Sequence, residues 1–321
     1  MLTEVEQTRL EVSKRTEAKK KSQLGQFLTP AKTAQFMAGL FSPTTDEVCR
    51  LVDPGAGIGS LSAAFLERIR SGELCFESVG LSAFEIDNAL SKELQKTLSS
   101  YAKNIPLSFE IQDGDFIENG LNTLQFSLED RFTHAILNPP YKKIGSNSRH
   151  RALLRQAGIE TVNLYTGFVA LTLALMKPGG EVVAIIPRSF CNGPYYRAFR
   201  QFVLERAAIK HIHLFDSRER AFKDDGVLQE NVIIKLESGG EQENVTVSTS
   251  ADDSFADLKV HSYPFDRIIF PDDQESFIHI PTYPGEMLLD ASREAKYSLE
   301  QLGVSVSTGP VVDFRMKEHL R

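Results

Sequence analysis

The sequence contains only three cysteines in 321 residues, and Cys49, Cys75 and Cys191 lie far apart. Because neither a Cys-x-x-Cys pair nor a Cys/His ligand spacing accompanies them, we expect no structural zinc site and assign no metal. Scattered cysteines without a disulfide framework are typical of buried thiols in a reducing compartment.

Long apolar segments are also missing from the sequence. No stretch approaches eighteen apolar residues, and the first residues, Met1 to Arg15, are rich in charge. We therefore expect neither a membrane span nor a signal peptide, and we expect a cytoplasmic protein. With 41% hydrophobic residues, the chain can bury one large α/β core and a smaller appendage.

A glycine-rich segment, Asp53-Pro-Gly-Ala-Gly-Ile-Gly59, follows an apolar stretch and precedes the amphipathic stretch Leu61 to Ile69. This pattern predicts a strand, a tight turn and a helix. The lysine of a phosphate loop is absent, and Gly55-x-Gly57-x-Gly59 misses the last step of a dinucleotide fingerprint. Since a carboxylate at Asp53 repels pyrophosphate and attracts ammonium, the turn fits a cationic, amino-acid-bearing ligand such as S-adenosylmethionine.

Acidic residues also follow the next two predicted strands. Ser78 to Phe84 leads into Glu85-Ile86-Asp87, and Leu107 to Ile111 leads into Asp113-Gly114-Asp115-Phe116. A carboxylate at the tip of the second strand commonly binds ribose hydroxyls, which favours Glu85, while Asp87 would cap the next helix. Asp115 could accept a hydrogen bond from an adenine amino group, with Phe116 against the ring. Each acid taken singly is also compatible with a surface turn.

The tetrapeptide Asn138-Pro139-Pro140-Tyr141 follows the apolar run Ala135 to Leu137. Its two prolines stiffen the loop and remove two backbone donors. The Asn138 side chain and the Pro139 carbonyl can together accept both hydrogens of a planar exocyclic amine, and Tyr141 offers a ring for stacking. Taken alone, the tetrapeptide is equally compatible with an ordinary turn.

In this order, these segments resemble the cofactor and catalytic motifs of S-adenosylmethionine-dependent DNA adenine-N6 methyltransferases. Gly25-Gln-Phe-Leu-Thr-Pro30 resembles the motif that precedes the glycine turn in the gamma class, which includes restriction-modification enzymes. The resemblance covers residues 23 to 236. It implies an α/β, Rossmann-like methyltransferase fold with a mostly parallel, doubly wound sheet, an N-terminal helical arm and a small C-terminal appendage.

The resemblance also implies roles for individual residues. Catalysis is implied for Asn138, Pro139, Pro140 and Tyr141. Cofactor binding is implied for a larger set: Phe27, Thr29, Pro30, Asp53, Gly55, Ala56, Gly57, Glu85, Asp87, Asp115 and Phe116. In the family, the first three pack over the methionine part of the cofactor; here Thr29 and Pro30 are also compatible with a helix start.

Downstream of the catalytic loop, the helix Phe168 to Met176, the turn Lys177-Pro-Gly-Gly180 and the strand Glu181 to Ile186 are expected from the family's sheet. Arg188 to Arg200 resembles the stretch that carries an aromatic residue stacked on a flipped base. Tyr196 aligns best there and Tyr195 is the alternative, although either is also compatible with simple packing.

The charge of the chain is not typical of a DNA-binding protein. Its formal net charge is −7, whereas DNA-binding proteins are usually basic on one face. Two local basic clusters offset this: one runs from Lys14 to Lys21, and the other comprises Lys142, Lys143, Arg149, His150, Arg151 and Arg155. Basic runs are often simply solvated. Because the second cluster follows Tyr141, we expect Lys142 and Lys143 to contact the substrate's phosphates.

We expect three parts in the chain: an N-terminal helical arm at residues 1–22, a methyltransferase domain at 23–240 and a C-terminal extension at 241–321. Gly239 to Asp253 is rich in Gly, Glu, Ser and Thr, which predicts a hairpin connection or linker. Val304 to Pro310 resembles the opening of a target-recognition region. We therefore expect either a truncated recognition domain or a separate specificity subunit.

The predicted reaction is methyl transfer from S-adenosylmethionine to the N6 amine of a flipped-out adenine in DNA, as part of a restriction-modification system. Flipping costs about a few kcal/mol, which stacking on Tyr141 and Tyr196 would offset. Two other functions stay open: a methyltransferase acting on a protein glutamine or an RNA base, and a non-catalytic nucleic-acid-binding subunit.

Overall fold

The computed structural model describes residues 1–15, 27–126, 131–215, 230–281, 297, 299 and 301–305. The chain divides into two compact units, Met1–Ile280 and Pro281–Arg321, and all elements described below belong to the first. Its strands are β1 Val48–Pro54, β2 Ser78–Glu85, β3 Leu107–Asp113, β4 Phe132–Leu137, β5 Met176–Pro187, β6 Ala207–Phe215, β7 Asn231–Ser238, β8 Val245–Ser250 and β9 Lys259–Tyr263.

Among the described residues these strands form one sheet with the order β3-β2-β1-β4-β5-β7-β6-β8-β9. Strands β1 to β5 are parallel to one another, whereas β7 is antiparallel to both β5 and β6. Strand β8 runs parallel to β6, and β9 closes the edge antiparallel to β8. The mostly parallel α/β sheet confirms the predicted fold class.

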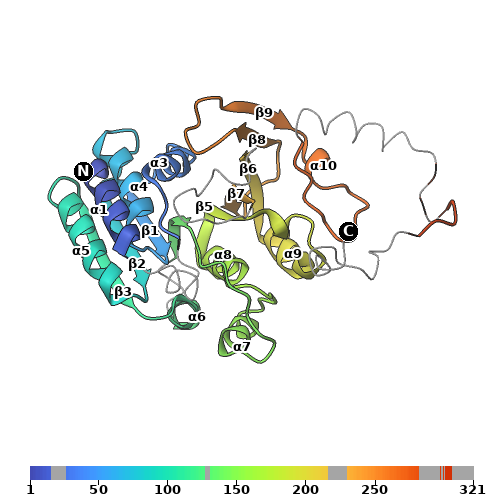
Figure 1. Ribbon diagram of the computed structural model, residues 1–321, viewed down its shortest axis with the longest axis horizontal. Coiled ribbons are helices and arrows are strands. Elements are labelled where there is room, and N and C mark those ends of the chain that lie inside the picture. Colours follow the sequence, from blue (N-terminus) through green and yellow to red (C-terminus); the bar gives the residue numbers. More distant parts are fainter. Residues whose placement is uncertain are drawn as a thin grey trace, which may run out of the picture. The chain divides into compact units, whose positions relative to one another are not determined.

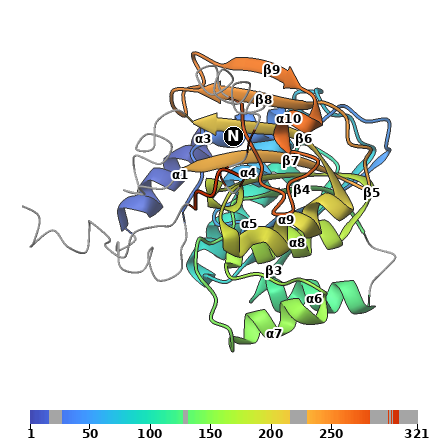
Figure 2. The same cartoon turned by 90° about the vertical axis from the view of Figure 1, so that its right-hand side faces the viewer.

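The helices of this unit cover both faces of the sheet (Figures 1 and 2). They are α1 Leu2–Arg15, α3 Ala31–Gly39, α4 Ser60–Arg70, α5 Asn88–Ala102, α6 Phe116–Phe126, α7 Arg149–Gln156, α8 Leu164–Ala174, α9 Arg197–Arg206 and α10 Phe265–Ile268. Side chains of α1, α3, α4 and α5 share one apolar core, and those of α6 to α9 share another. The sheet is therefore doubly wound. None of the described helices is long and apolar enough to cross a membrane.

The order of the parallel strands reverses between β1 and β4, which are neighbours although two strands lie between them in the chain. Open α/β sheets bind ligands outside the carboxyl ends of their strands at such a reversal. The Asp53 turn follows β1 and Asn138 follows β4. The topology therefore brings the two segments together at one edge.

Several local expectations were wrong. Helix α8 begins at Leu164 and ends at Ala174, and Lys177 to Gly180 lie within β5, where the register of β4 and β5 shifts. The predicted linker Gly239 to Asp253 contains β8, so the sheet continues beyond residue 240. Cys49 and Cys191 are buried, but Cys75 is exposed because it lies in the turn after α4.

The start of α3 is capped from another helix. Thr29 was an alternative candidate for the cap, but Pro30 occupies the cap position without a side-chain bond. Instead, the Ala31 N–H donates to Glu6 Oε2 of α1 at 3.0 Å. Arg9, which is 2% exposed, holds the same carboxylate at 2.8 Å. A carboxylate at a helix N-terminus accepts from a backbone N–H that has no partner within the helix, and it interacts favourably with the helix dipole. Because Glu6 fills this role, the Thr29 hydroxyl is available to another partner.

A one-directional hydrogen-bond chain joins β6 to β8. Ser250 donates to the Asp252 carbonyl at 2.8 Å, so Ser250 must accept from His213 Nε2 at 3.1 Å. His213 Nδ1 then accepts from Ser248 at 2.8 Å, and Ser248 accepts from His211 Nε2 at 2.7 Å. A carbonyl oxygen can only accept, and this fixes both neutral tautomers. Protonation of His213 would place a second donor against Ser248.

This chain predicts a pH-dependent stability. Burial lowers the pKa of His213 to about 3 and that of His211 to about 4, from 6.5. Below about pH 6.5 the unfolded chain therefore binds protons that the folded chain does not. The free energy of unfolding falls as the pH drops from about 6.5 to about 4 for His211 and to about 3 for His213, by at most about 1.4 kcal/mol per pH unit for each histidine. Replacing His213→Asn should flatten the curve of unfolding free energy against pH, measured by urea titration.

His261→Asn, on the exposed strand β9, is the matched control and should leave the slope unchanged. Equal slopes for the parent chain and His213→Asn would show that His213 does not titrate in this way.

Candidate active site

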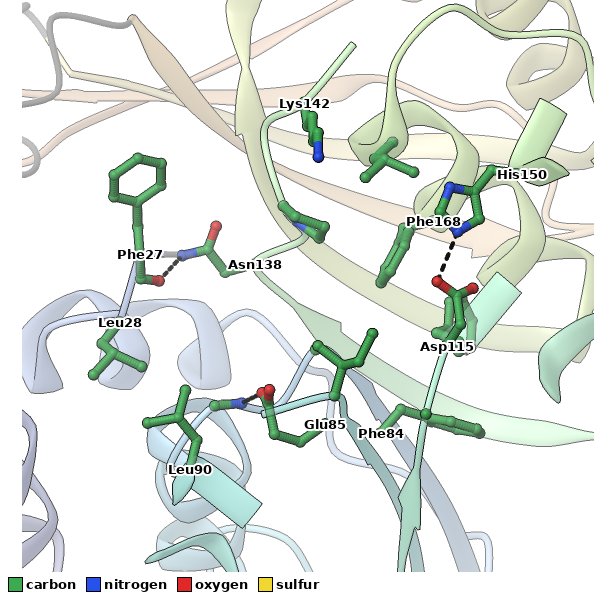
Figure 3. A pocket seen from close by; sticks show the side chains of 17 residues that line it. Phe27, Leu28, Phe84, Glu85, Leu90, Asp115, Asn138, Lys142, His150 and Phe168 are labelled. Carbon is green, nitrogen blue, oxygen red and sulfur yellow. Dashed lines mark hydrogen bonds and ion pairs between the residues drawn. The ribbon is translucent and has the colours of Figure 1, made fainter. Parts of the chain in front are cut away.

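A cavity of about 240 Å³ opens where the Asp53 turn, the Asn138 loop and α7 meet (Figure 3). Predicted site residues that line it are Phe27, Gly55, Gly57, Glu85, Asp115, Phe116, Asn138, Pro140 and Lys142. Predicted site residues that do not line it are Thr29, Pro30, Asp53, Ala56, Asp87, Pro139, Tyr141, Lys143 and Tyr196. The remaining wall is mostly apolar and includes Leu28, Phe84, Leu90, Leu164 and Phe168.

The glycine turn and Glu85 form the floor of the cavity. Gly57 has φ +59°, and a Cβ there would lie 2.9 Å from Leu28 Cδ2, so only glycine fits without displacing the wall. The Gly57 N–H donates to Glu85 Oε2 at 2.8 Å, and the Asp87 N–H donates to Glu85 Oε1 at 2.7 Å. Burial raises the pKa of Glu85, and these backbone donors oppose that shift. A carboxylate oxygen can accept more than one hydrogen bond, so the predicted contact of Glu85 with ribose hydroxyls is chemically compatible with these two bonds.

Asp53 lies behind the turn and not on the cavity wall. It is fully buried, and its Oδ2 accepts from the Ser62 hydroxyl at 2.6 Å. Burial raises the pKa of Asp53 to about 7, against the Ser62 hydrogen bond that lowers it. Within the described part of the chain its Oδ1 has no hydrogen-bond partner. Its predicted contact with the cofactor's ammonium group stays a prediction.

Asp115 has a partner that the sequence did not indicate. His150 Nε2 of α7 lies 2.8 Å from Asp115 Oδ2 (Figure 3). Asp115 Oδ1 accepts from the Ile117 N–H at 2.8 Å. The only signal for His150 in the sequence was its place in the second basic cluster. Asp87 caps α5 as predicted, since its Oδ1 accepts from the Ala89 N–H at 2.9 Å.

Phe116 forms an aromatic wall with two residues that sequence reasoning missed. Its ring centroid lies 5.0 Å from that of Phe84 and 5.0 Å from that of Phe168. The three rings come from the β3–α6 junction, β2 and α8. They were indistinguishable from core residues in the sequence, because aromatic side chains mostly serve burial.

Asn138 is held in one orientation. Its Nδ2 donates to the Phe27 carbonyl at 3.0 Å and to Thr29 Oγ1 at 3.1 Å. Because a backbone carbonyl can only accept, the nitrogen of the amide must face Phe27. The opposite end, Oδ1, accepts from the Tyr141 hydroxyl at 3.0 Å. The amide oxygen therefore keeps a lone pair for a ligand, and the Phe27–Thr29 segment acts through Asn138.

Four aromatic rings continue from Asn138 towards α9. The centroid distances are 5.7 Å from Phe27 to Tyr141, 6.2 Å from Tyr141 to Tyr165 and 5.9 Å from Tyr165 to Tyr196. The Tyr196 hydroxyl accepts from Asn163 Nδ2 at 2.7 Å, whereas Tyr195 is 79% exposed. The row connects the Asn138 loop to the Tyr196 loop through Tyr165, which is 3% exposed and was not anticipated from the sequence.

The second basic cluster is largely compensated by carboxylates. Arg149 pairs with Glu118 at 2.9 Å, and Arg155 pairs with Glu160 at 2.7 Å. Arg151 pairs with the same Glu160. Exposed arginines that already have partners offer less charge to a phosphate. The predicted contacts of Lys142 and Lys143 with the substrate's phosphates stay predictions.

The cavity fits S-adenosylmethionine. A Cβ at Gly57 in the floor would lie 2.9 Å from Leu28 Cδ2, Glu85 and Asp115 provide acceptors, and Phe116 provides an apolar wall. A buried carboxylate oxygen of Asp53 without a partner lies beneath the floor. Groups of three or more side chains that could bind a metal ion are absent from the described residues.

Comparison with known proteins agrees with this geometry. The model of the family "Eco57I restriction-modification methylase" matches residues 12–222. The chain is 55% identical to the type II methyltransferase M.BsuBI of Bacillus subtilis over 94% of its own length and 61% of that protein, and 40% identical to the type II methyltransferase M.PstI of Providencia stuartii over 94% and 60%. It thus spans about three fifths of the length of these relatives.

A structure assigned as a class I S-adenosylmethionine-dependent methyltransferase from Listeria monocytogenes superimposes with a TM-score of 0.61 at 13% identity, over 79% of this chain and 74% of that one. At this identity the likeness supports the fold alone. It is the class I methyltransferase fold that the parallel strands and the glycine turn predict.

The buried carboxylate of Glu85 yields a prediction of stability. Glu85→Gln keeps the shape of the side chain but turns one acceptor into a donor that faces the N–H of Gly57 or Asp87. A buried donor without an acceptor costs about 1–3 kcal/mol, so the free energy of unfolding should fall by that amount, as measured with urea. Glu110→Gln on exposed β3 should change it by less than about 0.5 kcal/mol. A loss as small in Glu85→Gln would show that these two hydrogen bonds contribute little.

Proposed function

Because the chain belongs to the Eco57I restriction-modification methylase family, we propose that it transfers a methyl group from S-adenosylmethionine to the N6 amine of an adenine in DNA. The single observation that carries this proposal is the fixed orientation of the amide of Asn138, a residue that lines the cavity. Modification of the cell's own DNA would take place in the cytoplasm. Type II relatives favour DNA as the substrate.

The chain's residues act mainly by positioning. Asn138 Oδ1 and the Pro139 carbonyl accept the two hydrogens of the target amine, which frees its lone pair from conjugation with the ring. The rings of Tyr141 and Tyr196 stack on the base after it leaves the duplex. The bound cofactor supplies an electrophilic methyl group on sulfur. Holding the reactants in line can contribute about 7–11 kcal/mol in favourable cases.

Proton transfer needs no dedicated base. The target amine would become cationic on taking the methyl group, with the sulfur–carbon electron pair returning to sulfur, and would then lose its proton to water. Burial raises the pKa of Tyr141, so this hydroxyl stays protonated and continues to donate to Asn138 Oδ1. Tyr141 therefore also orients the acceptor.

Asn138 and Thr29 provide the first kinetic prediction. Asn138→Ala should lower the single-turnover rate of methyl transfer by about 10²–10³-fold, as when one positioned polar group is lost, with unchanged cofactor affinity by calorimetry. Thr29→Val removes one hydrogen bond of about 1 kcal/mol and should lower the rate by about 5–10-fold. Thr44→Val, far from Asn138 in a surface loop, is the control. Near-normal turnover of Asn138→Ala would exclude the proposed role.

Charge compensation provides a second prediction. Glu160→Gln frees Arg151 and Arg155 from their shared partner, so the affinity for unmethylated duplex DNA should rise and the slope of log K against log salt should steepen by about one to two units. Glu205→Gln, which frees only Arg206 on α9, should change neither quantity. Filter binding at two salt concentrations measures both. An unchanged slope in Glu160→Gln would place this cluster outside the DNA contact.

The same acceptors would also bind a glutamine amide of a protein or an amine of an RNA base. Incubating the chain with labelled cofactor and, separately, with unmethylated DNA, RNA and ribosomal protein distinguishes these substrates. We expect label in DNA. Label in RNA or protein alone would replace the proposal, and no label with any substrate would favour a non-catalytic role. Whether a separate recognition region or specificity subunit selects the DNA sequence stays a prediction.

A further inference from the structure

A buried arginine joins two parts of the chain beside the aromatic row. Arg200 of α9 is 1% exposed. Its Nη1 donates to the carbonyls of Phe190 at 2.9 Å and Gly193 at 2.8 Å. On the other side, its Nε and Nη2 donate to the Glu275 carbonyl at 3.0 and 2.8 Å. One guanidinium thus connects the loop after β5 to the segment after α10.

The geometry requires an arginine. Burial lowers the pKa of Arg200, and the carboxylate of Glu275 at 3.8 Å opposes that shift. The guanidinium lies 4.8 Å over the Phe277 ring. A planar fork of fixed donors can reach three carbonyls in different directions, whereas lysine offers one point charge on a flexible stem. The buried charge is therefore satisfied only while both segments stay in place.

The segment that receives Arg200 is itself ordered by side chains. Asp273 accepts from the N–H groups of Glu275 at 2.9 Å and Phe277 at 2.7 Å. The Ile278 N–H donates to the Cys191 carbonyl at 2.9 Å, which is a second link to the same loop. Residues 273–278 therefore form a support behind the loop.

The loop supported in this way carries Tyr196. The Tyr196 N–H donates to the Gly193 carbonyl at 3.1 Å, the same oxygen that Arg200 holds. A Cβ on Gly193 would lie 2.6 Å from Tyr196 Cδ2 and 2.7 Å from the Ser189 carbonyl, so the ring packs directly on the glycine. With its hydroxyl bound to Asn163, the ring is fixed at both ends. A shift of Gly193 must shift the ring.

We propose that Arg200 is a positioning residue for the target base: it fixes the Phe190–Gly193 loop against residues 273–278 and thereby sets the ring of Tyr196. This inference rests on the proposed function, because the group stacked on Tyr196 is the flipped adenine. It makes residues 273–278, which follow β9, part of the base-binding site. Arg200 itself does not line the cavity.

The absence of tryptophan from the chain allows a direct test. Tyr196→Trp introduces the chain's one tryptophan as a reporter on the loop. In this background, Arg200→Lys should lower the fluorescence anisotropy and raise quenching by acrylamide, without any ligand present. Arg206→Lys is the matched control, because Arg206 lies on the same helix over the Phe202 ring at 4.0 Å. Equal anisotropy and quenching in the two variants would overturn the proposal.

Gly193→Ala perturbs the same ring without removing a buried charge. The φ of Gly193 is −73°, which suits alanine, so the added methyl acts on Tyr196 and the Ser189 carbonyl alone. It should change the reporter as Arg200→Lys does, and Gly39→Ala, where a Cβ meets nothing within 4 Å, should not. An unchanged reporter in Gly193→Ala would also overturn the proposal. If Arg200→Lys does not fold, this pair still tests the link from Gly193 to the ring, without which Arg200 cannot position it.

Kinetics separate positioning from general damage. In the chain that retains Tyr196, Arg200→Lys should raise KM for unmethylated plasmid DNA and lower kcat, while KM for S-adenosylmethionine stays unchanged. An equal rise in both KM values would indicate a structural role and contradict positioning. If the parent chain methylates no DNA, the proposed function fails, whereas the fluorescence of the reporter still tests whether Arg200 sets the ring.

Discussion

The hydrogen bonds of the Asn138 amide are the constraint on which the site depends. They join two segments more than one hundred positions apart in the chain, since Nδ2 donates to Phe27 and Thr29 while Oδ1 accepts from Tyr141. Both segments must be placed by the sheet and by α3 before the amide can point one way. The Glu6 carboxylate, by capping α3 from α1, leaves Thr29 for this purpose. The orientation of the Asn138 amide therefore depends on both the cap of α3 and the topology of the sheet.

The cavity next to this amide combines a glycine floor with carboxylates that already serve the backbone. Glu85 fixes the turn through Gly57 and Asp87, and Asp115 fixes the start of α6. Such groups are preorganised, because their orientation is set before a ligand arrives. The cost is burial of charge, visible in the raised pKa of Glu85.

The sequence predicted the fold and much of the cavity because both depend on local pattern. Apolar runs followed by Glu85, Asp115 and Asn138 identify strand ends, and parallel strands bring their ends to one edge. What it missed depends on contacts between distant positions. His150 meets Asp115 across 35 positions, Ala31 meets Glu6 across 25, and Arg200 meets Glu275 across 75. The sequence also did not indicate that Asp53 is buried and does not line the cavity, because the pattern of residues does not specify the direction of a side chain.

The central claim is that a fixed amide oxygen at Asn138 presents an exocyclic adenine amine for methylation. The most direct measurement is mass spectrometry of nucleosides from unmethylated plasmid DNA that was incubated with the chain and isotopically labelled S-adenosylmethionine. The account predicts label in N6-methyl-2′-deoxyadenosine and in no other nucleoside. Label in a methylated cytosine, or on a ring carbon, would contradict it.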